Sequence, residues 1–361
     1  MESPLLENEA PTVIDVDLVE KARLAINEAL QDAANVDLSW IHPAPSDEGW
    51  TLAPDALRFI TSLVSKLEPR HVLELGSGLS TRVLARACAS LSEGCAVSSV
   101  DHDPEFGGVA KQQYLARPEL GCEVSMQVAP IVARKYCDKW LPVYLWQLER
   151  FASPELFDLV IVDGPPAALG GREGALYQVM DFAKIGTVVL LDDVIRAEEQ
   201  TALDHWRDNY GDAIEIIQLP GFIRGLAAVI VLKPVPSSQL SEHRLHLTRR
   251  EIQKLFRPED VCIVVGDDWW REEIAGEYRS LPFLEHEGEN WGSPPDDETA
   301  VSELERMRRA GVNFITFGRP FFWWLEHYRD LSSHLRSRFN CVLENDRLIV
   351  FDLHQGNHLG Q

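Results

Sequence analysis

The stretch VLELGSGLST, residues 72–81, decides how the first half of the chain folds. Apolar residues lead into Glu74, and Gly76 and Gly78 then flank a serine. Glycines this close to the end of a buried strand permit a tight turn and allow a ligand to approach bare backbone. The stretch therefore predicts a strand, a ligand-binding turn and the start of a helix.

Strand-like and helix-like segments alternate around this turn. Strands are predicted at 71–75, 96–101, 122–129, 157–164, 186–193, 213–219 and 226–234. Helices are predicted at 17–33, 80–91, 174–183 and 197–210, and the stretch 49–69 is predicted to be an entry loop and a helix that stops at Pro69. Further helical stretches are predicted after Pro104 and around Tyr136, Trp140 and Trp146. Such alternation predicts a parallel sheet covered on both faces. The last two strands are joined only by the loop PGFIRG, so we expect them to form a hairpin with one antiparallel strand.

Composition and charge exclude several kinds of partner. The formal net charge is −23, and no run of Lys and Arg offers a basic patch, so neither nucleic acid nor an anionic membrane is an expected partner. No apolar run approaches the length of a membrane span, and the acidic opening does not resemble a signal peptide. The six cysteines are scattered, which favours reduced thiols and a cytoplasmic protein.

The length of 361 residues favours two domains rather than one. We predict an N-terminal extension with a helix at 1–49, a first domain at 50–234, a Pro/Ser-rich linker at 235–247 and a smaller α/β domain at 248–361. Within the last, strands are expected at 260–268, 313–318 and 341–353, and helices at 297–311 and 321–335.

Three nucleotide-binding motifs compete for the glycine turn. A Walker loop requires a lysine that does not follow here, and a dinucleotide fingerprint requires a third glycine where this chain has Thr81. The E/D-x-G-x-G loop of S-adenosylmethionine-dependent enzymes fits Glu74 to Gly78, since a sulfonium nucleoside carries no phosphate. Glu74 would then offer charge to an ammonium group, and Asp101 could accept from both ribose hydroxyls. Taken singly, each motif is also explained by a structural turn or cap.

The ordered set of motifs resembles bacterial class I methyltransferases, in a small-molecule branch with D-G-P-P after the fourth strand. The set is WTLAPDALRFI, VLELGSGLST, SSVDHDPEF, VAPI, FDLVIVDGPP, VVLLDDVIR and HW, from about Trp50 to Lys233. The resemblance implies a Rossmann-like sheet with a terminal antiparallel hairpin, and S-adenosylmethionine as cofactor. The cofactor-binding residues that it implies are Glu74, Gly76, Ser77, Gly78, Ser80, Thr81, Asp101, His102, Ala129, Pro130 and Asp163.

Acidic residues follow two neighbouring predicted strands, Asp163 after one and Asp192 with Asp193 after the next. They resemble the metal ligands of catechol-type O-methyltransferases, and hard oxygen ligands suit Mg²⁺ or Mn²⁺. Such an ion would lower the pKa of an acceptor hydroxyl, so these three residues are both the metal-binding and the catalytic candidates. Alternatively, they cap a helix and anchor a turn. Arg172 and Arg196 either hold an acidic substrate or form surface ion pairs.

The chain from about Thr248 onward resembles a small α/β domain attached to bacterial glycosyltransferases. The features are VCIVVGDD, FLEHEGENWGSPPDD, GVNFITFGRPFFWWLEHY and LIVFDL, and they imply a context of polysaccharide biosynthesis with glycan-assembly proteins as partners. Asp267, Asp268 and the loop around Trp291 follow strand ends that could hold a sugar.

The whole pattern predicts a methyltransferase that modifies an oxygen of a small polar acceptor such as a saccharide, with a divalent metal as an option. The alternative is a non-catalytic module that binds a glycan or a glycosyltransferase and retains a degenerate cofactor loop. The sequence does not specify the oligomeric state.

Overall fold

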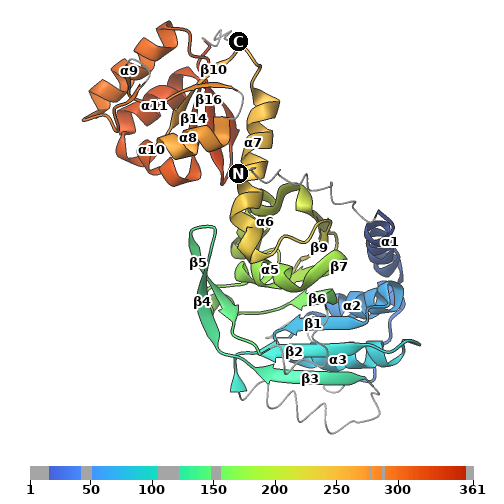
Figure 1. The fold of residues 1–361 in the computed structure, drawn as a ribbon. Coiled ribbons are helices and arrows are strands. Elements are labelled where there is room, and N and C mark those ends of the chain that lie inside the picture. Colours follow the sequence, from blue (N-terminus) through green and yellow to red (C-terminus); the bar gives the residue numbers. More distant parts are fainter. Residues whose placement is uncertain are drawn as a thin grey trace, which may run out of the picture. The chain divides into compact units, whose positions relative to one another are not determined.

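The structure, a computed structural model, describes residues 16–41, 51–104, 122–147, 156–275, 278–286 and 289–354. The chain divides into two compact units, residues 1–238 and residues 239–361. Each unit has its own main sheet (Figure 1). Within the described ranges, every helix is too short or too polar to cross a membrane.

The first unit is built on a seven-stranded sheet. Its strands are β1 (His71–Leu75), β2 (Ala96–Asp101), β3 (Glu123–Val128), β6 (Phe157–Val162), β7 (Ala183–Asp192), β8 (Ile214–Leu219) and β9 (Leu226–Val231). They lie in the order β3-β2-β1-β6-β7-β9-β8, and β9 runs in the opposite direction to the other strands of this sheet. The predicted fold class, a Rossmann-like sheet that ends in an antiparallel hairpin, is confirmed.

Both faces of this sheet are buried. Leu159 and Ile161 belong to a core shared with α1 (Val16–Asp32), α2 (Pro54–Leu67) and α3 (Leu79–Ala89). Val160 and Val162 alternate with them along β6, so they point to the other face, and they are equally buried. Two further helices are α5 (Gly174–Val179) and α6 (Ala197–Tyr210). Burial on both faces explains why the strands are continuous apolar runs.

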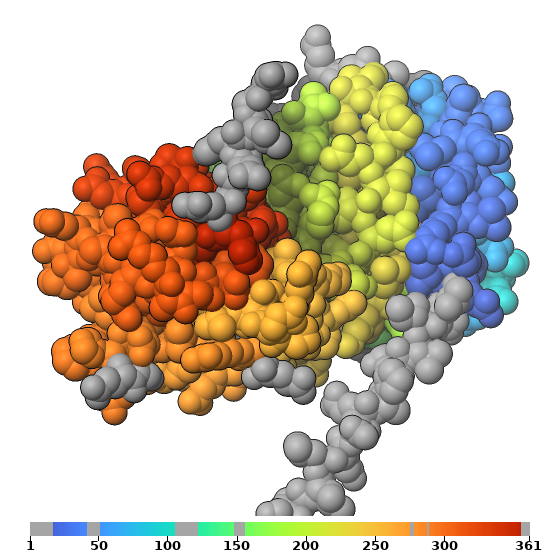
Figure 2. Space-filling model, turned by 90° about the horizontal axis from the view of Figure 1, so that it is seen from above, coloured from blue at the N-terminus to red at the C-terminus, as the bar shows by residue number. Residues whose placement is uncertain are grey.

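The first helix packs on one face of the sheet, in contact with β7 and β9. In Figure 2, α1 in blue lies against the segment in yellow that contains β8. Arg23 of α1 donates from Nε to Glu215 Oε2 of β8 at 2.8 Å, and Gly186 of β7 approaches the backbone of Leu18. The predicted N-terminal helix is therefore packed against the first unit.

Residues 131–144 form a β-hairpin where we expected a helix. β4 (Ile131–Tyr136) and β5 (Lys139–Tyr144) pair antiparallel, and Cys137 and Asp138 between them have φ of 46° and 70°. Left-handed conformations at both positions match the twist of a two-residue hairpin turn. Tyr136 stacks on Tyr177 of α5, with ring centroids 5.2 Å apart. The helix prediction is wrong: the aromatic and apolar residues of this segment lie on two antiparallel strands that pair with each other.

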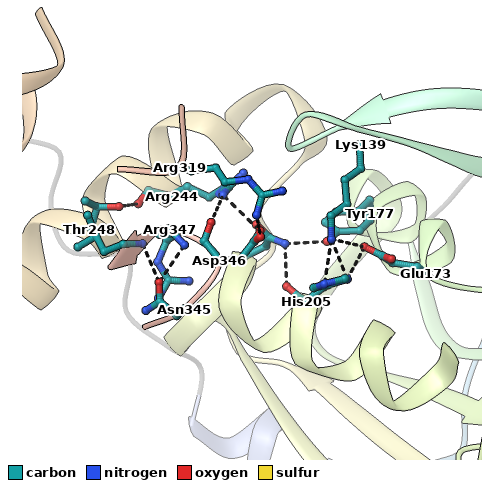
Figure 3. Close-up of polar contacts among 12 residues, drawn as sticks. Lys139, Glu173, Tyr177, His205, Arg244, Thr248, Arg319, Asn345, Asp346 and Arg347 are labelled. Atoms are coloured by element: carbon teal, nitrogen blue, oxygen red, sulfur yellow. Dashed lines mark hydrogen bonds and ion pairs between the residues drawn. The ribbon is translucent and has the colours of Figure 1, made fainter. Parts of the chain in front are cut away.

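A polar cluster attaches the hairpin to the helices of the same unit. Lys139 Nζ lies 2.9 Å from His205 Nε2, and His205 Nδ1 lies 2.9 Å from Glu173 Oε1 (Figure 3). The helix expected after Pro104 falls on 105–121, outside the described residues.

The second unit is a smaller α/β fold. Its main strands are β10 (Val261–Val265), β11 (Arg279–Leu281), β14 (Phe314–Gly318), β15 (Asn340–Glu344) and β16 (Leu348–Asp352), in the order β11-β10-β14-β16-β15. Two short strands, β12 (Glu285–His286) and β13 (Glu289–Asn290), form a separate hairpin. The helices are α7 (Leu240–Leu255), α8 (Asp268–Ala275), α9 (Asp297–Arg309), α10 (Trp323–His327) and α11 (Arg329–Arg338).

Two predictions for this half need correction. α7 begins at Leu240, within the stretch predicted as a linker, and the side chains of Leu240 and Leu247 are buried. Arg244 of α7 donates to the backbone oxygen of Asp346 at 3.2 Å, which ties α7 to the turn before β16 (Figure 3). The single helix expected at 321–335 is broken at Tyr328, whose hydroxyl donates to the Pro294 carbonyl at 2.7 Å.

Candidate active site

The turn after β1 brings three strand ends together. The Gly76 N–H donates to the Val100 carbonyl of β2, and the Asp163 N–H after β6 donates to the Leu75 carbonyl, both at 2.8 Å. Gly76 has φ of +104°, and a Cβ on it would lie 3.1 Å from the Asp163 carbonyl carbon. Glycine is therefore required here for two reasons: the backbone is left-handed, and two segments of the chain approach each other closely.

Asp101, at the end of β2, holds the glycine turn from the side. Its Oδ2 accepts from the Ser77 N–H, and its Oδ1 accepts from the Asp103 N–H, each at 2.8 Å. Burial raises the pKa of Asp101, although both hydrogen bonds oppose that shift. A carboxylate offers about four acceptor positions, so Asp101 retains capacity for ligand hydroxyls. His102 lies next to it, with Nδ1 3.3 Å from Asp101 Oδ1.

Glu74 lies beneath the turn, fully buried. Its Oε2 accepts from Thr81 Oγ1 and from Ser99 Oγ, each at 2.5 Å, and Thr81 Oγ1 in turn accepts from the Gly78 N–H. Burial raises the pKa of Glu74 to about 7. Glu74, Thr81 and the buried Ser80 therefore support the turn from below, and this geometry does not place them against a ligand.

A cavity of about 530 Å³ opens above the glycine turn. It is lined by Gly76, Ser77, Asp101, His102, Asp103, Tyr144, Asp163, Gly164, Pro166, Ala168 and Leu169. Of the predicted cofactor residues, this set contains Gly76, Ser77, Asp101, His102 and Asp163. Ala129 and Pro130 follow β3, where their backbones bond to Asp101 and Leu145, and they do not line the cavity.

Tyr144 is a site residue that the sequence did not reveal. Its side chain is 1% exposed, it lines the cavity, and its hydroxyl has no hydrogen-bond partner among the described residues. Burial raises the pKa of this hydroxyl. A Cβ on Gly164 would overlap the Tyr144 hydroxyl, which explains the glycine in the D-G-P-P turn. Cys137 and Asp138 are not a pair that usually marks a two-residue hairpin turn, so the local sequence carried no strong signal for the hairpin that delivers Tyr144.

The three predicted acidic residues meet at the carboxyl ends of β6 and β7. One carboxylate oxygen from each of Asp163, Asp192 and Asp193 lies within 4.8 Å of the others. Burial raises the pKa of Asp163 well above its usual range, with Arg172 opposing the shift, and raises the pKa of Asp192 to about 6. The predicted convergence of these side chains is confirmed.

Arg172 already supplies a cation to this cluster. Its side chain is 5% exposed, and Nη2 donates to Asp163 Oδ1 at 2.9 Å and to Asp193 Oδ2 at 2.7 Å. Nη1 donates to the Asp192 carbonyl at 2.7 Å. A divalent ion between the same carboxylates would lie against a buried guanidinium and be repelled by it. The residues therefore do not fit the metal expected at Asp163, Asp192 and Asp193, because the buried guanidinium of Arg172 already pairs with two of the three carboxylates.

A second cavity of about 260 Å³ is also lined by Asp163. It is lined by Asp163, Pro166, Ala167, Ala168, Arg172, Asp193, Arg196 and Arg224. Asp163, Pro166 and Ala168 line both cavities, so the two cavities are neighbours.

Residues 73–194 match a protein family described as a methyltransferase domain. Over these residues the chain is similar to a methyltransferase domain. The match begins within β1 and ends at Val194, so it includes the glycine turn, Asp101 and both acidic strand ends. No curated protein matches this chain.

Several solved structures are similar to part of the chain. An O-methyltransferase from Bacillus cereus in complex with SAH has 19% sequence identity, covers 58% of this chain and 90% of its own, and gives a TM-score of 0.38. The O-methyltransferase TomG from Streptomyces achromogenes in complex with SAM has 19% identity, with coverage of 56% and 89% and a TM-score of 0.37. A methyltransferase from Geobacter sulfurreducens has 16% identity, with coverage of 63% and 93% and a TM-score of 0.35.

Proposed function

We propose that the first unit transfers a methyl group from S-adenosylmethionine to an oxygen atom of a small polar acceptor. The observation that carries the proposal is one cavity in which the glycine turn, the Asp101 carboxylate and the Asp163 carboxylate meet. Its volume of about 530 Å³ is within the range of small-molecule sites.

The residues of the larger cavity fit S-adenosylmethionine. Gly76 presents bare backbone, and Asp101 presents a carboxylate that suits a pair of ribose hydroxyls. His102 and Tyr144 also line this cavity, His102 with an imidazole ring and Tyr144 with a buried hydroxyl. When bound, S-adenosylmethionine supplies an electrophilic methyl group on a sulfonium.

Asp163 is the proposed general base. It faces both cavities, and Arg172 fixes its orientation through a 2.9 Å hydrogen bond. Burial raises the pKa of Asp163, and a carboxylate with a raised pKa is a better proton acceptor near neutral pH. Asp163 would take the proton of the acceptor hydroxyl, while Arg172, itself paired with Asp193, holds the Asp163 carboxylate in place. The proposal contains no divalent ion.

Calorimetric titration with S-adenosylmethionine tests the cofactor assignment. Asp101→Ala is expected to weaken binding at least ten-fold, because it removes a buried charged acceptor from the cavity. Asp204→Asn on the surface of α6 is the matched control and should bind as the wild type does. Absence of binding by the wild type would leave the non-catalytic alternative in place.

The saccharide acceptor and the link to polysaccharide biosynthesis extend the proposal to the second unit. Three of its tryptophans are exposed, Trp269 at 63%, Trp291 at 66% and Trp323 at 46%. Exposed aromatic faces offer flat platforms on which sugar rings can stack. Quenching of tryptophan fluorescence by oligosaccharides, lost in Trp291→Ala, would support this part, and an unchanged spectrum would remove it.

The cytoplasm is the compartment that we propose. Cys88, Cys95, Cys122, Cys137, Cys262 and Cys341 are all free thiols. Unpaired cysteines suit a reducing environment. Fractionation of the native host with an antibody to the full chain tests this part, and recovery outside the cytoplasmic fraction would contradict it.

A further inference from the structure

We infer that Tyr144 is a specificity-determining residue of the larger cavity, where its hydroxyl donates a hydrogen bond to one ribose hydroxyl of the bound nucleoside. The same ribose hydroxyl would in turn donate to the Asp101 carboxylate. The inference rests on the proposed function, since it takes the nucleoside of S-adenosylmethionine as the occupant of that cavity. It starts from a buried polar group that the described residues leave without a partner.

The Tyr144 hydroxyl is buried without a hydrogen bond. The side chain is 1% exposed and lines the larger cavity, and its oxygen has no partner among the described residues. A buried hydroxyl that makes no hydrogen bond destabilises the folded chain, and a phenylalanine of the same shape would avoid this cost. The hydroxyl is therefore explained better by a ligand than by the packing of the free protein.

The backbone of Tyr144 is fixed by neighbouring segments. Tyr144 pairs with Ile131 across the hairpin, and its carbonyl accepts from Gln178 Nε2 of α5 at 2.6 Å. The next residue, Leu145, donates from its N–H to the Pro130 carbonyl at 2.8 Å. A buried side chain on a fixed backbone loses little conformational freedom when a ligand binds, so its hydroxyl is suited to a specific contact.

The hydroxyl lies beside the glycine turn. A Cβ on Gly164 would overlap the Tyr144 hydroxyl and would lie 3.6 Å from the Gly76 Cα. Ser77, the next residue of the turn, donates from its N–H to Asp101 Oδ2 at 2.8 Å. The Tyr144 phenol and the Asp101 carboxylate therefore flank two consecutive residues of the turn, and both side chains line the cavity.

The groups around this hydroxyl select the kind of ligand group. Burial raises the pKa of Tyr144, and the charges of Asp101 and then of Asp163 add to that shift, so the phenol keeps its proton and acts as a donor. The Asp101 carboxylate disfavours an anionic ligand group in the same cavity. A ligand hydroxyl can accept from the phenol and give its own proton to Asp101, whereas an ammonium group can only donate. Ribose carries two such hydroxyls on adjacent carbons.

Calorimetric titration of the full chain with S-adenosylhomocysteine, adenosine, 2′-deoxyadenosine and 3′-deoxyadenosine tests the inference. Tyr144→Phe is expected to weaken the binding of S-adenosylhomocysteine and of adenosine about five- to ten-fold, the loss of one neutral hydrogen bond. It should have no effect on the binding of the deoxyadenosine that lacks the hydroxyl contacted by Tyr144. A merely structural role of Tyr144 would affect all four ligands alike. Without ligand, Tyr144→Phe should be at least as stable as the wild type in urea, because its hydroxyl has no partner to lose.

Tyr136→Phe is the matched control. Tyr136 lies in the same hairpin and is 7% exposed, but its ring stacks on Tyr177 and it is not among the residues that line either cavity. It should bind each of the four ligands within two-fold of the wild type.

Three results would overturn the inference. Tyr144→Phe could bind adenosine as tightly as the wild type does, it could lose the same factor with adenosine and with both deoxyadenosines, or Tyr136→Phe could show an equal loss. If S-adenosylhomocysteine binds equally to the wild type and to Tyr144→Phe, the ribose contact is wrong and the methyltransferase function stands. If adenosine binds with the expected dependence on Tyr144 and neither S-adenosylmethionine nor its demethylated product binds, the contact stands and the proposed function fails. A wild type that binds none of these nucleosides rejects both.

Discussion

Replacing Arg172 by methionine removes the cation from the acidic cluster with little change in side-chain length. Arg172 contacts Asp163 at 2.9 Å and Asp193 at 2.7 Å, and it is 5% exposed. Removing one partner of a buried ion pair costs about 3–5 kcal/mol, since it leaves a buried charge without compensation. Domains are typically stable by about 5–15 kcal/mol, so the free energy of unfolding should fall by a large fraction. Arg172→Met with Asp193→Asn should recover part of the loss.

The same substitution should create the metal site that the wild type lacks. Carboxylate oxygens that share one ion at about 2.0–2.6 Å lie at most about 5 Å apart, and those of Asp163, Asp192 and Asp193 lie within 4.8 Å. With the guanidinium gone, a divalent ion can relieve their mutual repulsion. At about 100 times its Kd, such an ion would raise the free energy of unfolding by about 2.7 kcal/mol.

Urea unfolding with and without Mn²⁺, together with Mn²⁺ titration followed by electron paramagnetic resonance, measures both effects. We expect Arg172→Met to bind Mn²⁺ and to be stabilised by it, and the wild type to show neither response. Methyl transfer by the wild type should continue in excess chelator. A wild type that binds Mn²⁺ as tightly as the variant, or whose activity disappears with the chelator, would refute the assignment of Arg172 as the resident cation.

Three further predictions concern neighbouring residues. Gly76→Ala should abolish cofactor binding in calorimetry and lower the free energy of unfolding by about 1–3 kcal/mol, because φ of +104° strains a side chain and the Cβ meets Asp163. Gly164→Ala should destabilise by about 1–3 kcal/mol in urea through overlap with the Tyr144 hydroxyl, and Tyr144→Phe in the same chain should restore most of the loss; no recovery would contradict that contact. Asp192 has its pKa raised from 3.8 to about 6, so its stabilising contribution is complete below pH 4 and is lost as the pH rises toward 6, by about 3 kcal/mol. Asp192→Asn should flatten this fall in a pH series of unfolding curves, and an unchanged slope would assign it to other groups.

The glycine turn and its neighbours could be predicted because their signals are local. Gly76 needs a left-handed backbone directly after a strand, and Asp101 ends the next strand, so both positions follow from the run of residues around them. The antiparallel β9 was likewise evident from a connection too short for a crossover helix. Parallel strands bring their carboxyl ends to one edge, which is why Asp163, Asp192 and Asp193 were expected together.

The hairpin of β4 and β5 did not follow from local pattern, which predicted a helix there. Its aromatic residues suit a helix or a strand, and the choice depends on Tyr136 stacking on Tyr177, a residue on a distant helix. Because Tyr144 reaches the cavity only through this hairpin, its place in the site was hidden too.

The cation of the acidic cluster depends on tertiary structure in the same way. Residue types and strand order place three carboxylates at one edge, and from that alone a metal ion is a reasonable expectation. Arg172 lies 9 residues from Asp163 and 21 from Asp193, and only the folded chain brings its guanidinium within 3 Å of both. Electrostatic attraction depends on distance in space rather than on separation along the chain. The three carboxylates could therefore be predicted from the sequence, whereas their pairing with Arg172 is determined by the tertiary structure.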